Sequence, residues 1–184
     1  MSEADALNLS GGLTQNDFAL FGLTPSFDLD KPMLERLRQS LLRQVHPDRF
    51  SAEGSAAQRI AMQWTVRINE AYARLKDPLS RATYLCHLNG VNTSARPTLS
   101  PDMLMQQMQW REELDEANAS DVLALIQKAK SFFDQGLAQL HALCDQQAAW
   151  DDVLKHVQGL MFVQKFIQDV QARLDRDWDE SLDV

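Results

Sequence analysis

Apolar residues recur every three or four positions through most of the chain, which is the period of an amphipathic α-helix. One such face in the first half consists of Leu34, Leu37, Leu41 and Val45. Asp30 is a suitable N-cap for this helix, and Pro47 ends it near His46, because proline disfavours helical backbone in the residue before it. After a loop of about ten residues, a second face consists of Ile60, Trp64, Ile68, Ala71 and Leu75. The two helices are therefore expected to pack as an antiparallel pair.

Other helical patterns flank this pair. A short apolar helix is expected over 17–23, and another over 79–88 that Asn89 and Gly90 would end. Three long helical patterns cover about 101–118, 121–146 and 150–178, and Ser120 or Asp121 would cap the second. No segment shows the strict alternation of a β-strand, so the sequence predicts an all-α fold.

The stretch between these two groups of helices is rich in Asn, Thr, Ser and Pro, as linkers are. We therefore predict two domains. The expected parts are a flexible leader at 1–15, an N-terminal helical domain at 16–90, a linker at 91–100 and a C-terminal three-helix bundle at 101–184.

Charge is distributed unevenly along the chain. The net charge is −8, yet residues 1–99 hold 11 Lys/Arg against 10 Asp/Glu, whereas residues 100–184 hold 7 against 16. The acidic second half argues against nucleic-acid binding, which demands cationic contacts. The sequence has no apolar run of about 18 residues that predicts a membrane span, and no secretory signal. With two distant cysteines, Cys86 and Cys144, these features favour a cytoplasmic protein with reduced thiols.

The tripeptide His46–Pro47–Asp48 lies in the loop between the two helices predicted to be antiparallel. Proline restricts the backbone there, so the neighbouring side chains have less entropy to lose on binding. This order of elements resembles a J-domain: a short helix, a basic helix, His-Pro-Asp and then a long helix. The resemblance implies that the loop binds a seventy-kilodalton heat-shock ATPase and stimulates its ATP hydrolysis, with Asp48 engaging a positive side chain of that chaperone.

The helix before this loop carries Arg36, Arg38 and Arg43. Arg36 and Arg43 are seven residues apart, opposite the leucine face, and therefore share one solvent-facing side. A basic face of this kind would steer an acidic partner. By resemblance these arginines also contact the ATPase chaperone, with Arg38 closer to the apolar side.

The first helix of the predicted bundle carries two separate faces. Met103, Trp110 and Leu114 fall within an arc of about 40°, which predicts the core stripe. A helix needs one apolar stripe to join a bundle, so a second arc of about 140° is expected to be partly exposed. This second face holds Leu104, Met105, Met108, Gln109, Glu112 and Glu116. Methionine-rich surfaces suit adaptable partner binding.

Two runs, 77–85 and 103–116, narrow the choice among J-domain proteins. Their sequences, Asp-Pro-Leu-Ser-Arg-Ala-Thr-Tyr-Leu and Met-Leu-Met-Gln-Gln-Met-Gln-Trp-Arg-Glu-Glu-Leu-Asp-Glu, resemble the HscB family, the specialised co-chaperones of iron–sulfur assembly. The sequence lacks the Gly/Phe-rich linker and Cys-x-x-Cys repeats of the general DnaJ type. It also lacks the N-terminal Cys-x-x-Cys module of eukaryotic HscB members, which indicates the bacterial type.

The HscB resemblance implies two partners, an HscA-type ATPase chaperone and an IscU-type iron–sulfur scaffold protein. The second face of 103–116 would receive the scaffold, with apolar contact from its leucine and methionines, charged contact from Glu112 and Glu116, and Phe162 nearby. Gln109 stands where the family often has an acid, so its contribution is open. The chain would be an adaptor rather than an enzyme, and it would need no cofactor, because two distant cysteines are too few for iron–sulfur ligation.

Several alternatives remain at this point. One alternative is that the His46–Asp48 loop has only a structural role, and another is that it forms a catalytic dyad, although no nucleophile signature accompanies it. For the helix at 103–116, the alternatives are that both of its faces are buried in the core, or that its carboxylates are ordinary surface charges. His141 and Cys144 supply two metal ligands, too few for a tetrahedral site. The alternative functions are a J-domain adaptor that tethers a chaperone to an unrelated helical partner, and a metal-binding or hydrolytic bundle.

Overall fold

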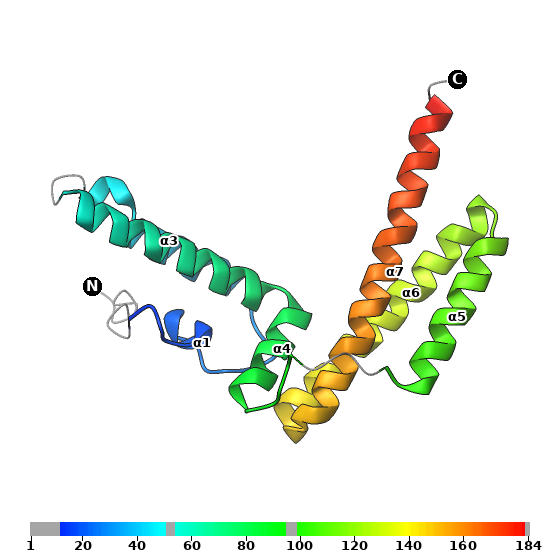
Figure 1. Ribbon diagram of the computed structural model, residues 1–184, viewed down its shortest axis with the longest axis horizontal. Helices are drawn as coiled ribbons and strands as arrows, with labels where there is room; N and C mark the ends of the chain where they lie inside the picture. The colour runs from blue at the N-terminus through cyan, green and yellow to red at the C-terminus, as the bar shows by residue number, and fades with distance from the viewer. Residues whose placement is uncertain (1–11, 51–53, 95–98, 183–184) are drawn as a thin grey trace. The chain divides into compact units, whose positions relative to one another are not determined.

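The computed structural model describes residues 12–50, 54–94 and 99–182, and every regular element in these ranges is helical (Figure 1). The first elements are α1 (Asp17–Leu20), α2 (Lys31–Gln44), a 3₁₀ turn η3 (Pro47–Phe50), α3 (Ser55–Lys76) and α4 (Pro78–Leu88). The later elements are α5 (Pro101–Glu116), α6 (Ala119–His141), a π-helical turn η4 (Ala142–Gln147) and α7 (Trp150–Leu182). The all-α prediction is confirmed.

The chain divides into two compact units, Met1–Leu85 and Cys86–Val184. This division falls inside α4, a few residues before the linker expected at 91–100. The described residues leave out 95–98, at the centre of that linker, and most of the leader expected at 1–15. The predicted domain limits therefore stay predictions. No helix in the described ranges is long and apolar enough to cross a membrane.

The first unit is built on α2 packed against α3. The Asp30 side chain accepts a hydrogen bond from the Met33 backbone N–H at 3.2 Å, so the predicted N-cap is present. Leu34 and Leu41 are buried on one side of the interface. On α3 the buried residues are Ala61, Ile68, Ala71 and Leu75. The prediction that Ile60 belongs to this face is wrong. Ile60 is 54% exposed, and the smaller Ala61 occupies the buried position.

A buried ion-pair cluster attaches α1 to α3. Asp17 is fully buried, and its carboxylate lies 2.7 Å from the Arg67 guanidinium and also pairs with Arg74. Arg67 donates two further hydrogen bonds, to the carbonyl oxygens of Leu13 and Gln15. The segment before α1 is therefore held against α3 by hydrogen bonds, and α1 itself contacts α3 and buries Phe18 and Leu20.

The second unit contains α5, α6 and α7 as a helical bundle (Figure 1). Its core centres on Trp110, which is 1% exposed, stacks with Phe166 at 5.3 Å and meets Phe132 edge-on at 5.4 Å between ring centroids. The close contact of α6 with α7 at Gly136 favours glycine, because a Cβ there would clash with a methyl carbon of Leu160.

Two details of α6 differ from the sequence-based expectation. Its N-cap is Asn118, whose side-chain oxygen accepts from the backbone N–H groups of Ser120 and Asp121, the two residues we expected to cap it. Its C-terminal end widens into the π-helical turn η4, and Ala148 follows in the left-handed region with φ 51°. The prediction that Ser120 or Asp121 caps α6 is therefore wrong, because both residues donate backbone hydrogen bonds to the N-cap Asn118.

Candidate partner-binding surfaces

The His-Pro-Asp loop is exposed and held by local contacts. The side chains of His46 and Asp48 are 58% and 91% exposed. His46 Nδ1 accepts a hydrogen bond from the Asp48 backbone N–H at 3.3 Å and lies 3.6 Å from the Asp48 carboxylate. Arg49 donates to the carbonyl oxygen of Arg43 at 3.2 Å, which ties the turn back to the end of α2. The loop therefore presents an imidazole and a carboxylate together from a constrained turn.

The three arginines of α2 are not equivalent. Arg36 and Arg43 are exposed, on the side of α2 opposite buried Leu34 and Leu41. Arg38 instead donates to the side-chain oxygens of Asn69 at 3.1 Å and Glu35 at 3.0 Å. Arg36 and Arg43 are thus free to meet a partner, whereas Arg38 bridges α2 and α3.

Aromatic and acidic neighbours complete the surroundings of Arg38. Its guanidinium carbon lies 4.7 Å from the centre of the Tyr72 ring. Hydrogen bonds from Tyr72 and Gln39, together with the nearby Arg38 charge, hold the pKa of Glu35 below its usual range. Arg38 therefore lies in a polar contact network whose geometry depends on how α2 and α3 pack.

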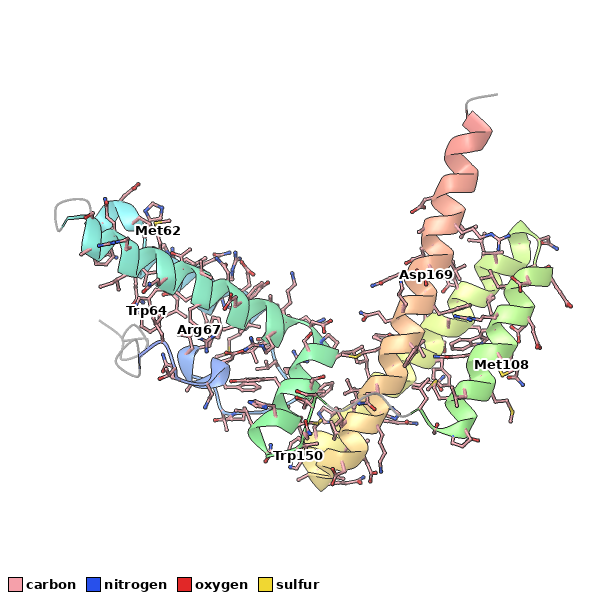
Figure 2. The ribbon with its side chains drawn as sticks, in the orientation of Figure 1. Met62, Trp64, Arg67, Met108, Trp150 and Asp169 are labelled. Atoms are coloured by element: carbon pink, nitrogen blue, oxygen red, sulfur yellow. The ribbon has the colours of Figure 1, made fainter. Side chains whose placement is uncertain are left out.

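The second face of α5 is exposed as its pattern indicates. Leu104, Met105 and Met108 are 48%, 60% and 64% exposed. Figure 2 labels Met108 on α5. The predicted polar members of this face are exposed as well: Gln109, Glu112 and Glu116. Trp110 is buried at the opposite side, with Met103 and Leu114 partly buried against its cluster. The two-face prediction is therefore confirmed as geometry.

A groove of about 210 Å³ lies between α5 and α7, and Phe162 lines it beside α5, at the border between the two faces of that helix. Phe162 is 39% exposed and lines the groove with Gln107 and Arg111 of α5. Gln107 and Arg111 are not among the residues predicted from the sequence. Their place in the helical pattern, between the two apolar faces of the helix, could have indicated them.

The described residues contain no group of three or more His, Cys, Asp or Glu side chains placed to hold a metal ion. Cys86 is buried, its thiol hydrogen-bonds to the Trp150 carbonyl oxygen at 3.4 Å, and burial together with Asp151 raises the pKa of this thiol to about 11. A thiol with a pKa this high is a poor nucleophile at neutral pH.

Comparison with known proteins gives a consistent result. Residues 99–171 match the family model described as the HSCB C-terminal oligomerisation domain. The co-chaperone protein HscB homolog of Burkholderia thailandensis is 41% identical over 170 residues, covering 89% of this chain and 97% of that protein. The chain belongs to the HscB co-chaperone family. The HscB homolog of Bordetella petrii is 42% identical over 159 residues, covering 84% of this chain and 94% of the homolog.

Solved HscB structures share the architecture. Chaperone HscB from Vibrio cholerae superposes with a TM-score of 0.78 at 34% identity, covering 88% of this chain and 99% of that one. Human co-chaperone HscB gives a TM-score of 0.81 at 22% identity over 87% of this chain and 82% of the human one, which supports the fold alone. The HscB resemblance and the J-domain followed by a helical C-terminal domain are thus confirmed. The roles assigned to individual residues stay predictions.

Proposed function

We propose that this HscB family member stimulates the ATPase of an HscA-type chaperone and delivers an IscU-type iron–sulfur scaffold protein to it. The observation that carries the proposal is the second face of α5. Three large apolar side chains are about half exposed there, although Trp110 already joins the helix to the bundle core. Exposed apolar side chains clustered on one face are typical of a protein-interaction site.

On the first unit, the chaperone-binding surface comprises the loop and the exposed arginines. His46 and Asp48 project from a turn fixed by Arg49, so little entropy is lost on docking. Arg36 and Arg43 add positive charge that accelerates encounter with an acidic chaperone patch. Arg38 acts as a positioning residue, because its contacts hold α2 in register with α3.

On the second unit, the scaffold covers Leu104, Met105 and Met108, and the aromatic ring of Phe162 extends the apolar area. Glu112 and Glu116 lie beside them without an ion-pair partner among the described residues. These carboxylates are therefore available to cations on the scaffold, and Gln109 offers a neutral hydrogen bond in the same row. The iron–sulfur cluster is cargo of the scaffold in this scheme.

Joining the two partners through one chain raises the effective concentration of scaffold at the chaperone. The loop then favours the hydrolysis-competent state of the chaperone, because it binds that state more tightly. The adaptor itself performs no bond chemistry in this scheme.

Isothermal titration calorimetry against an IscU-type scaffold tests the second surface. Replacing Leu104, Met105 and Met108 together by Ala removes about 1 kcal/mol each of apolar contact, so the Kd is expected to rise roughly 100-fold. A matched control replaces Leu123 and Met161, which are 59% and 43% exposed elsewhere on the bundle, and should leave the Kd unchanged. Absence of scaffold binding by the unaltered chain would favour the tethering adaptor instead.

A steady-state ATPase assay with an HscA-type chaperone tests the first surface. His46→Gln is expected to remove the stimulation, and Arg43→Ala to weaken it in a way that added salt reduces. Arg38→Lys is the informative third variant: it keeps the charge, so a loss of stimulation would come from the altered α2–α3 contact. Full stimulation by His46→Gln would overturn the J-domain assignment of function.

A further inference from the structure

Two methionine sulfurs lie side by side on the exposed face of α5. Met105 and Met108 are three residues apart, so their side chains are neighbours on the helix surface. They are 60% and 64% exposed, the highest values among the methionines in the described ranges, with Met62 of α3 next at 59%. Small solutes in water can therefore reach both thioether groups.

The two cysteines compete poorly with these methionines for a small oxidant. Cys86 is fully buried and Cys144 is 4% exposed. Burial and the nearby Asp151 charge raise the pKa of the Cys86 thiol to about 11, so its reactive thiolate is scarce at neutral pH. Oxidation of sulfur follows exposure and, for cysteine, thiolate character. The exposed methionines are therefore the sulfurs that an oxidant in solution meets first.

Oxidation of Met105 and Met108 is compatible with an intact fold. The helix α5 joins the bundle through buried Trp110, and Met103 and Leu114 pack against the same cluster. Met105 and Met108 instead face solvent on the other side of the helix, where water can hydrogen-bond to an added oxygen. Their oxidation would therefore change the surface of α5 and leave its packing in place.

We propose that Met105 and Met108 form a peroxide-sensitive switch on the scaffold-binding surface, an inference that rests on the proposed function, in which the scaffold covers both side chains. Hydrogen peroxide transfers one oxygen atom to each thioether sulfur. An S–O bond forms as the O–O bond breaks, and the hydroxide that leaves takes the proton of the transferred hydroxyl and becomes water. Sulfur is oxidised by two electrons and the peroxide is reduced.

The sulfoxide weakens binding because it converts a flexible apolar side chain into a polar one. In the complex with the scaffold, the new oxygen leaves water for an apolar contact, and a polar group buried without a hydrogen bond is costly. Each sulfoxide is expected to weaken scaffold binding about tenfold, and the two together about 100-fold. Methionine sulfoxide reductases restore the thioether, so the switch is reversible.

Isothermal titration calorimetry of the full chain against an IscU-type scaffold, before and after treatment with hydrogen peroxide, tests the switch. The peroxide is removed before the scaffold is added, so that only this chain is oxidised. Peptide mass spectrometry identifies the oxidised methionines, and thermal melts followed by circular dichroism check the fold. The Kd should rise about 100-fold on oxidation and return to its untreated value after the reductases have acted.

Two double variants separate this face from the other exposed methionines, and each is compared with its own untreated sample. Met105→Leu with Met108→Leu keeps apolar side chains that peroxide does not oxidise, so peroxide should no longer change the Kd. Met33→Leu with Met62→Leu, in the first unit, leaves the face of α5 oxidisable. Peroxide should therefore raise the Kd of this second variant as much as it does for the unaltered chain.

The possible results distinguish the switch from the proposed function. An unchanged Kd in a chain that carries both sulfoxides overturns the switch and leaves the proposed function in place. The switch is equally overturned if the Met105→Leu and Met108→Leu variant keeps its sensitivity, or if oxidation unfolds the chain. It is also overturned if a dose of peroxide that oxidises free methionine leaves both side chains unreacted. If the untreated chain does not bind the scaffold, the proposed function fails, and the switch fails with it.

Discussion

The carboxylate of Asp17 is the feature of the first unit on which a single substitution should act most strongly. Asp17 is fully buried, and the side chains of its partners Arg67 and Arg74 are 17% and 42% exposed. Asp17→Asn preserves shape and the backbone hydrogen bond from Asp17 N–H to Tyr84, but removes the negative charge. Two guanidinium groups would then face one another across a neutral amide.

Breaking a buried ion pair by removing one partner costs about 3–5 kcal/mol. Both arginines keep some contact with water, and Arg74 more than Arg67, so the loss should fall near the lower end, at about 3 kcal/mol. A unit of this size is stable by only about 4–13 kcal/mol. The substitution should therefore remove a large share of that stability.

Urea denaturation followed by ¹⁵N NMR of the indole N–H groups measures this loss unit by unit. Trp64 is the one tryptophan before residue 86 in the sequence, so its indole signal reports the first unit, and the other three report the second. The Trp64 transition should move to lower urea while the others stay in place. A loss below about 1 kcal/mol would refute the reasoning, because the buried charge would then contribute no more than an ordinary hydrogen bond.

Two further predictions concern the α6–α7 contact in the second unit. Burial lowers the pKa of His156, whose ring nitrogen lies 3.2 Å from the carbonyl oxygen of Gly136. The unfolded chain therefore binds more protons than the folded one near pH 6, so the free energy of unfolding should fall as pH decreases from 7.5 to 5.5. His156→Gln should reduce this dependence in urea titrations at the two pH values; an unchanged slope would assign it to other groups. Gly136→Ala should cost about 1–3 kcal/mol, because Leu160 is buried and cannot withdraw from the added Cβ. Gly159→Ala meets only the flexible end of Met103, at 3.0 Å, so it should cost less than Gly136→Ala; equal losses in thermal melts would contradict this packing argument.

Regular helical periodicity predicted the framework well. The Asp30 cap, the buried leucines of α2 and the second exposed face of α5 are local properties, fixed by residues within a few turns of one another. Ile60 shows where helical periodicity fails to predict the buried position. The pattern favours the larger side chain, whereas close packing of α2 on α3 selects the small Ala61 for the buried position.

The structure at the end of α6 could not be predicted from the sequence either, for a different reason. A π-helical turn and a left-handed Ala148 carry no composition signal, because alanine normally favours helix. Such features arise when the chain must turn to bring α7 back onto α6. The role of Arg38 was likewise hidden, since its contacts with Asn69 and Tyr72 join residues about thirty positions apart in the sequence.

In the proposed function, the acidic character of the second unit is expected to give the exposed face of α5 its specificity. Half-exposed Leu104, Met105 and Met108 would by themselves favour pairing of two identical bundles. Residues 100–184, however, hold 16 acidic against 7 basic side chains, and two such surfaces repel each other. A partner that covers this face must therefore bring cations around an apolar centre to meet Glu112 and Glu116. In the proposed contact those carboxylates lie at the exposed edge, so added salt should slow association more than it speeds dissociation.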